Sequence, residues 1–170
     1  MITANLHVTV AGELLTIRPI CMTDVAMEAE FVRKLSPQTR HYRFFGGVRE
    51  LSPAQLKLFC EVDGRHSMAF VATVQKNGCE TEIGVGRYAP NSKADVREMA
   101  VTIPDEWQHK GLGKLLVQQL IASARDYGVR QLYSVNLADN SAMRDLTHEL
   151  GMCATCDPED ANQVIYSLAV

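Results

Sequence analysis

The sequence lacks the segments that direct a chain into or across a membrane. Residues 1–12 hold no basic stretch followed by an apolar one, so we expect no signal peptide. No apolar run approaches the ~20 residues that a membrane-spanning helix needs. Cysteine is also scarce, and an odd number, five, suits a reducing compartment better than a framework of disulfides. We therefore expect a cytoplasmic protein with no membrane partner.

The chain also lacks any block of basic residues. Its formal net charge is −3, which argues against a nucleic-acid partner, because sequence-independent binding of that kind draws on many phosphate contacts. Repeats, linkers and low-complexity tracts are missing as well. A length of 170 residues with 46% hydrophobic residues is typical of one globular domain. We expect a single domain spanning residues 1–170 that exists as a monomer or a homodimer.

Strand and helix patterns are mixed along the chain, which predicts an α/β fold. Strands are expected at residues 14–20, 68–74, 82–89, 96–103, 132–137, 153–157 and 164–169, with an optional further strand at 6–10. Helices are expected where a capping residue precedes an apolar stripe, namely after Thr23, Ser36, Ser52 and Asn140, and also after the loop that ends at Gly113. Lys76-Asn77-Gly78 indicates a hairpin between two of the strands.

Two pairs of residues are open to a structural or a functional interpretation. Gly84 and Gly86 lie on the same face of one predicted strand. A bare face of this kind fits either a bound ligand or a helix packed close to the sheet. Phe44 and Phe45 fit either the core or one wall of a substrate or acyl-CoA groove.

The stretch Trp107–Gly113 lies between a predicted strand and a long amphipathic helix. Glycine lets a bulky ligand approach the backbone closely, and the start of a helix presents free N–H groups and a partial positive charge. Lys110 and Lys114 add cations. These features predict a cradle for a diphosphate. A Walker loop matches poorly because Leu115 follows Lys114, and a dinucleotide fingerprint needs a third glycine.

The same loop resembles the acyl-CoA loop of the GNAT superfamily of N-acetyltransferases, written Q/R-x-x-G-x-G/A. Gln108, Gly111 and Gly113 fill its three fixed places. Segments upstream, among them Leu35-Ser-Pro37 and Arg40-His-Tyr-Arg-Phe-Phe-Gly46, resemble the acetyltransferase domain of bacterial protein lysine acetyltransferases. The resemblance runs from about residue 14 to the C-terminus. It implies a GNAT-like fold, a mixed, twisted sheet of six to seven strands with a splayed centre and about four to five flanking helices.

The resemblance also implies that acetyl-CoA is the cosubstrate. Backbone groups of Met99, Ala100 and Val101 would run along the pantetheine arm, with Val101 polarising the thioester carbonyl. Asn140 would hydrogen-bond the end of that arm, unless it serves only as a helix cap. The diphosphate would lie on the loop and the first helical turn, formed by Gln108, His109, Lys110, Gly111, Leu112, Gly113 and Lys114.

Acetylation of an amine requires a group that removes a proton from the acceptor. A lysine-type amine has a pKa of about 10.4, so at neutral pH it is protonated and not nucleophilic. Glu98 stands just before the loop, at the position where the resemblance places a catalytic glutamate. The alternative is a solvated strand carboxylate, with Arg97 or Arg87 as a possible partner. We expect direct attack on the acetyl carbonyl, with no covalent enzyme intermediate.

The proton donor to the leaving thiolate is harder to identify. Many family members carry a tyrosine on the last helix, where this sequence has Thr147. A thiol has a pKa of about 8.5 and leaves with little help. Either water protonates it, therefore, or catalysis is weak.

Cys153-Ala-Thr-Cys156 resembles a redox motif or half of a zinc site. No second C-x-x-C exists, and His148 is the nearest further ligand. Residues three apart on a strand face opposite sides. We expect neither a bridge nor a bound metal at these cysteines.

The sequence as a whole predicts an enzyme that moves an acetyl group from acetyl-CoA to a primary amine, with a protein lysine as the leading acceptor. A small amine, such as a polyamine or an amino sugar, is the alternative substrate. An alternative of a different class is a non-catalytic module that senses acyl-CoA. A complete loop without a base would indicate that module, and the presence of Glu98 argues for the enzyme.

Overall fold

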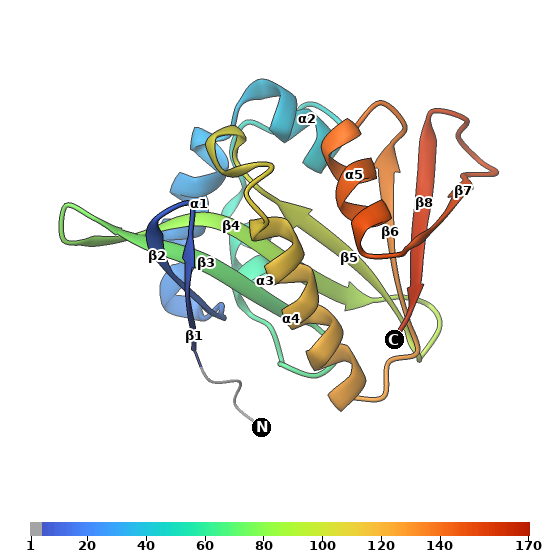
Figure 1. Ribbon diagram of the computed structural model, residues 1–170, viewed down its shortest axis with the longest axis horizontal. Helices are drawn as coiled ribbons and strands as arrows, with labels where there is room; N and C mark the ends of the chain where they lie inside the picture. The colour runs from blue at the N-terminus through green and yellow to red at the C-terminus, as the bar shows by residue number, and fades with distance from the viewer. Residues whose placement is uncertain (1–4) are drawn as a thin grey trace.

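The computed structural model describes residues 5–170, and in this range eight strands form one mixed sheet (Figure 1). The strands follow the spatial order β1-β2-β3-β4-β5-β6-β8-β7, and only β5 and β6 are parallel neighbours. Their bounds are β1 (Leu6–Val10), β2 (Glu13–Pro19), β3 (Met68–Lys76), β4 (Cys79–Pro90), β5 (Val96–Thr102), β6 (Gln131–Leu137), β7 (Cys153–Cys156) and β8 (Gln163–Ala169). The predicted α/β class is confirmed. The sheet is wider than the six to seven strands expected, because the optional segment at residues 6–10 pairs along its whole length with β2.

Five α-helices and two short 3-10 turns accompany the sheet in the described residues. The helices are α1 (Val25–Lys34), α2 (Pro37–Phe44), α3 (Pro53–Cys60), α4 (Leu112–Asp126) and α5 (Ser141–Glu149), and the turns are η1 (Met22–Asp24) and η2 (Asp105–Trp107). The caps predicted at Ser36, Ser52 and Asn140 are confirmed, since each side chain accepts a hydrogen bond from a backbone N–H of the first turn.

The prediction that Thr23 caps the first helix is wrong. Residues 22–24 form η1 instead, and α1 begins at Val25 with no side-chain cap. Asp24 takes the capping role for η1, because its carboxylate accepts a hydrogen bond of 2.8 Å from the backbone N–H of Cys21. The same carboxylate binds the Arg18 guanidinium at 2.8 Å, a contact with β2 that the local pattern does not reveal.

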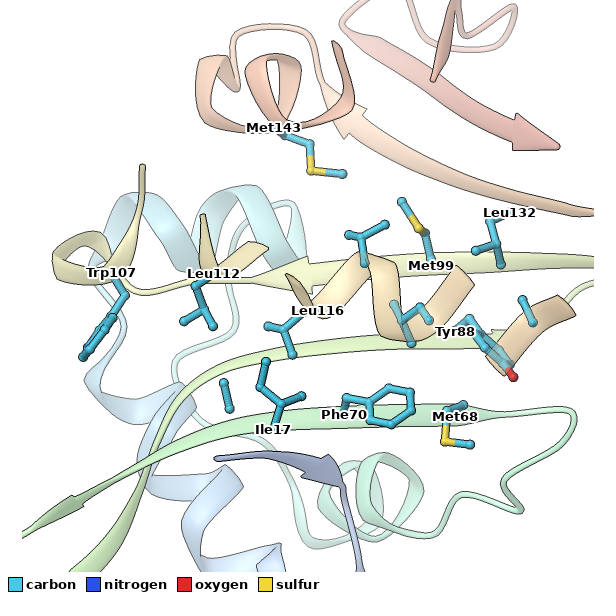
Figure 2. Close-up of a cluster of buried hydrophobic side chains, with 14 of the residues drawn as sticks. Ile17, Met68, Phe70, Tyr88, Met99, Trp107, Leu112, Leu116, Leu132 and Met143 are labelled. Atoms are coloured by element: carbon cyan, nitrogen blue, oxygen red, sulfur yellow. The ribbon is translucent and has the colours of Figure 1, made fainter. Parts of the chain in front are cut away.

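The helices cover the two faces of the sheet. Helix α4 packs against β3, β4 and β5 on one face, and α1 packs against β4 on the other (Figure 1). Leu112 and Leu116 of α4 face the sheet residues Ile17 and Phe70 (Figure 2). None of the helices that the structure describes is long and apolar enough to cross a membrane.

Gly84 and Gly86 allow α4 to lie close to β4. A Cβ atom at Gly84 would lie 3.0 Å from Ile103 Cδ1, and one at Gly86 would lie 3.3 Å from Leu116 Cβ. Such distances are tighter than ordinary contact, so the bare face is filled by packed side chains. The packed-helix interpretation of this glycine pair is therefore correct.

A cluster of charged side chains is buried on the opposite face of β4. Arg87 Nη2 donates a hydrogen bond of 2.6 Å to Glu28 Oε1 of α1. The other Glu28 oxygen and both oxygens of Glu82 have no partner among the described residues. Burial, together with the Glu28 charge, raises the pKa of Glu82 well above its usual value. Glu82 therefore keeps its proton to a higher pH than an exposed glutamate does.

Replacing Glu82 with Gln should stabilise the protein as the pH rises. The unfolded chain loses the Glu82 proton near the ordinary pKa, whereas the folded chain keeps it, so wild-type stability falls above that pH. Gln keeps a donor for Glu28 and has no proton to lose. We expect equal melting temperatures near pH 4 and a gain of about 2–4 °C at pH 8, on the order of 1 kcal/mol.

Glu80→Gln, on the same strand, is the control for this prediction, because its effect on stability should have the opposite sign as the pH rises. The hydrogen bond from Arg18 lowers the pKa of Glu80, so this carboxylate stabilises the fold above the ordinary pKa. Thermal melts from pH 4 to 8 should therefore show Glu80→Gln losing stability as Glu82→Gln gains it. If the difference in melting temperature between Glu82→Gln and wild type did not change with pH, the raised pKa of Glu82 would be contradicted.

The sheet is splayed at its centre. β5 and β6 pair only through Val96–Glu98 with Gln131–Tyr133. Beyond these pairs β5 stays with β4, and β6 stays with β8. An opening therefore forms between the carboxyl-terminal halves of two parallel strands, a position where α/β sheets commonly bind ligands.

Candidate active site

The opening between β5 and β6 contains a cavity of about 380 Å³. Its walls come from β5, from the loop before α4 and from the first turn of that helix, with β6 and α5 on the far side. Helix α2, which packs against β5, closes the remaining side.

The structure brings most of the predicted site residues together around this cavity. Its lining includes Glu98, Met99, Ala100, Val101, Gln108, His109, Gly111, Gly113, Lys114 and Asn140. Two predicted residues lie outside the lining. The Lys110 ammonium lies 5.0 Å from the centre of the Trp107 ring, and the Leu112 side chain is fully buried in the core.

The loop before α4 is held by hydrogen bonds and by two left-handed residues. Gln108 Nε2 donates to the Ile103 carbonyl at 2.9 Å and to Thr39 Oγ1 at 3.3 Å, which ties the loop to the end of β5 and to α2. His109 has φ of 57° and Gly111 has φ of 84°. The chain thereby turns sharply into α4, whose first-turn N–H groups have no intrahelical partner. These groups form a site suited to an anion at one end of the cavity.

Two residues of the first α4 turn contact α5, although the sequence predicted them to form part of a cationic site for the diphosphate. A Cβ atom at Gly113 would lie 3.1 Å from Leu146 Cδ2, so this glycine lets α5 approach α4. Lys114 Nζ donates a hydrogen bond of 2.7 Å to Glu149 Oε1, which also lies on α5. The Lys114 charge is therefore shared with a carboxylate instead of being free for a phosphate.

Glu98 lies at the end of the β5–β6 pairing, with its carboxylate exposed to the cavity. The Tyr133 hydroxyl donates a hydrogen bond of 3.2 Å to Glu98 Oε2 and accepts one of 2.8 Å from Asn91 Nδ2. Burial and the Glu98 charge raise the pKa of Tyr133. This hydroxyl therefore stays protonated and holds the carboxylate in place.

Neither arginine that the sequence offered as a partner binds Glu98, although its carboxylate is solvent-exposed. Arg87 binds Glu28 on the other face of the sheet. Arg97 is buried and donates to the carbonyls of Ala94 and Val96. Within residues 5–170, Glu98 takes part in no salt bridge, so its carboxylate is available to a substrate.

Thr147 is not placed to donate a proton. Its side chain is 1% exposed, and its hydroxyl donates to the Arg144 carbonyl at 3.0 Å. The tyrosine that lines the cavity is Tyr42 of α2. Its hydroxyl lies 3.4 Å from the Asp139 carbonyl oxygen, to which it donates. A phenol group therefore stands at the cavity at a residue to which the sequence pattern assigned no role in the site.

The sequence also missed residues on β6 and α2. Ser134 and Asn136 lie on the buried side of β6 and line the cavity, and a hydrogen bond of 2.9 Å joins them. Their spacing of two residues, in line with buried Leu132, was a usable signal, since polar residues on a core-facing stripe are unusual. Of the aromatic pair, Phe44 packs on the core, whereas Phe45 is 47% exposed and lines the cavity. Each interpretation thus holds for one of the two.

Cys153 and Cys156 lie on β7, and both are exposed free thiols. Among residues 5–170, no group of three or more His, Cys, Asp or Glu side chains is close enough together to hold a metal ion. The C-x-x-C pattern thus belongs to a strand at the edge of the sheet.

Comparison with known proteins gives concordant results. The model of the acetyltransferase (GNAT) family matches residues 32–152, a range that contains the entire cavity lining. An acetyltransferase of Pseudomonas aeruginosa is 45% identical over 159 residues, which are 94% of this chain and 86% of that protein. The acetyltransferase Pat of Mycolicibacterium smegmatis is 32% identical over 141 residues, which are 82% of this chain but only 41% of Pat.

Solved structures share the fold. The GNAT domain of S. lividans PAT superposes with a TM-score of 0.87 at 23% identity, over 98% of this chain and 97% of that domain. A cAMP-binding acyltransferase from Mycobacterium smegmatis superposes with a TM-score of 0.66 at 29% identity, over 98% of this chain and 47% of that protein.

Proposed function

Because the chain belongs to the GNAT acetyltransferase family, and is therefore an N-acetyltransferase that uses acetyl-CoA as its cosubstrate, we propose that its acceptor is a lysine side chain of a protein. The observation that carries this proposal is the position of Glu98. Its carboxylate, which forms no salt bridge within residues 5–170, stands in the same cavity as the N-terminus of α4, so one opening holds a candidate base and an anion site. The similarity to Pat supports the lysine acceptor.

In the proposed reaction the CoA diphosphate binds the first-turn N–H groups of α4, at the loop from Gln108 to Gly113. The pantetheine arm lies in the opening and bonds the backbone of Met99–Val101, and Asn140 contacts its end. Asn140 also caps α5, because its Oδ1 accepts a hydrogen bond of 3.1 Å from the Met143 N–H. Its Nδ2 group is left to donate to the arm, so one side chain can serve both roles.

Glu98 removes a proton from the lysine ammonium, directly or through water, and the free amine attacks the acetyl carbonyl. The Val101 N–H stabilises the oxyanion that forms. The C–S bond then breaks, the acetyl group stays on the lysine nitrogen, and the CoA thiolate takes a proton from water or from Tyr42. The amine loses its second proton to solvent.

Release of CoA thiol from acetyl-CoA tests the proposed acceptor directly. The panel should contain lysyl peptides, a folded protein mixture, a polyamine and an amino sugar, with mass spectrometry locating the acetyl group. We expect acetylated lysine side chains at the highest kcat/KM. A polyamine or amino sugar that reacts far faster would replace the lysine proposal, and no thiol release with any amine would favour a sensor.

Tyr133→Phe should weaken catalysis without affecting acetyl-CoA binding. The change removes the hydrogen bond that orients Glu98, a bond of about 1 kcal/mol, so kcat should fall roughly 2- to 10-fold. The KM for acetyl-CoA should stay constant, because Tyr133 does not line the cavity. Tyr127→Phe, at an exposed tyrosine after α4, is the matched control and should behave as wild type. Unchanged kcat in Tyr133→Phe would remove Tyr133 from its positioning role.

A further inference from the structure

Arg43 lines the α2 side of the cavity without an acidic partner. Two other arginines with little exposure are paired with carboxylates, Arg18 with Asp24 and Arg87 with Glu28. Buried Arg97 instead donates to backbone carbonyls. In the part of the chain that the structure describes, the Arg43 guanidinium forms neither a salt bridge nor a hydrogen bond. It lies instead 4.9 Å from the centre of the Phe44 ring and 5.7 Å from that of Phe59.

The surroundings of Arg43 leave its charge uncompensated on the core side. Arg87 stacks on the same Phe59 ring, at 4.2 Å, and uses Glu28 as its own partner. The pKa of Glu82 is raised by its burial and by the Glu28 charge, which weakens Glu82 as a counter-charge. Burial and the Arg87 charge lower the pKa of Arg43 to about 10, which still leaves it a cation at neutral pH.

The cavity side offers Arg43 only the proposed base. Glu98 is the carboxylate of the cavity whose charge acts on Arg43, and no hydrogen bond joins the two described side chains. The anion site for CoA lies at the other end of the cavity, at Gly111 and the start of α4. Arg43 thus faces the space left for the acceptor. A planar guanidinium in that position is suited to a bidentate carboxylate.

We propose that Arg43 binds a carboxylate of the acceptor, so that the preferred acceptor carries an acidic group close to the amine that is acetylated. This inference rests on the proposed function, in which the amine approaches Glu98. The acceptor then spans the cavity mouth with its amine at Glu98, its carboxylate at Arg43 and its apolar stem against Phe45. Two sources supply this chemistry: the α-carboxylate of an amino acid, or an acidic side chain beside a lysine in a protein.

Pairs of acceptors that differ only in one carboxylate test the proposal. The first pair is a lysyl peptide with Glu or Gln beside the lysine. The second is Nα-acetyl-lysine and its carboxamide, and the third is a small amino acid and its amide. The wild-type enzyme should prefer the acidic member of at least one pair roughly 10- to 100-fold in kcat/KM, the range for one charge-assisted hydrogen-bonded pair. The pair that shows the preference identifies the source of the carboxylate.

Variants at Arg43 assign this preference to the residue. Arg43→Met keeps an apolar stem on the two rings and should abolish the preference, so that the acidic and neutral members of each pair react at similar kcat/KM. Arg43→Lys should restore part of it. Arg40→Gln is the control on the same helix, since Arg40 bonds the Arg33 carbonyl and does not line the cavity. Its preference should equal that of wild type.

Each outcome supports or overturns the proposal. No preference in any pair of the wild-type enzyme overturns it, and so does a preference that survives in Arg43→Met. An Arg43→Met variant that raises KM for acetyl-CoA instead would assign Arg43 to the cosubstrate and also overturn it. Failure of the lysine acceptor is a separate result: it appears as inactivity of the first two pairs, while the third pair still tests Arg43.

Discussion

Glu98→Gln is expected to lower kcat by ~10²–10⁴-fold at neutral pH, the usual loss when a general base is removed. Gln has the shape of the carboxylate and can still accept the Tyr133 hydrogen bond, so the cavity should keep its form. Only the capacity to take the ammonium proton disappears. Acetyl-CoA affinity, measured by calorimetry, should barely change, because the proposed diphosphate site lies on the loop and α4, away from Glu98.

The pH dependence of this loss in kcat tests whether Glu98 acts as a base. The deficit of Glu98→Gln should shrink as the pH approaches the amine pKa of about 10.4, where fewer acceptors need to be deprotonated. Glu106→Gln is the control, since Glu106 is exposed on η2 and does not line the cavity. A Glu98→Gln enzyme with wild-type kcat at neutral pH, under conditions where chemistry limits the rate, would exclude Glu98 as the base.

Gly111→Val is expected to weaken acetyl-CoA binding by about 10-fold or more. Gly111 has φ of 84°, a conformation that a β-branched residue adopts only with strain. No atom lies within 4 Å of the added Cβ, so the effect arises from the backbone and from overlap with the ligand. The N–H groups that follow would shift, and each contact to an anion is worth roughly 0.3–1 kcal/mol.

Gly128→Val separates this loss of binding from a loss of stability. Gly128 follows α4 at its other end, has φ of 71° and likewise has no atom within 4 Å of its Cβ position. Both variants should lose stability to a similar extent, about 1–3 kcal/mol for a strained backbone. Only Gly111→Val should lose affinity in calorimetry. Equal acetyl-CoA affinity in Gly111→Val and wild type would mean that the diphosphate binds elsewhere.

Features set by a few neighbouring residues were predictable from the sequence. The Ser52–Gln55 capping box forms in both directions, at 3.3 Å and 2.9 Å. Asn77 and Gly78 have the positive φ values of a tight hairpin turn. These signals are reliable because the atoms that satisfy them are at most three residues apart. The glycines of the loop from Gln108 to Gly113 and the helix that follows them are also neighbours in the sequence, and the structure places this loop at the cavity.

Features that depend on distant pairs were not predictable in the same way. Arg18 and Glu80, for example, are 62 residues apart in the sequence and form a hydrogen bond of 3.0 Å. The place of Tyr42 and Arg43 at the cavity depends on how α2 packs on β5, which no local pattern specifies. The pairing of Lys114 with Glu149 depends in turn on the approach of α5 to α4. The sequence therefore indicated where the cosubstrate binds more fully than where the acceptor binds.

The short β5–β6 pairing divides the sheet into two parts that share only three residue pairs. Backbone amide and carbonyl groups along the facing edges beyond Glu98 and Tyr133 remain without a partner strand. Such vacancies at the centre of a sheet are costly unless something bonds them. In the proposed complex the amide groups of the pantetheine arm form hydrogen bonds with these backbone groups, as a neighbouring strand would. The cosubstrate would then be a structural component of the sheet for as long as it stays bound.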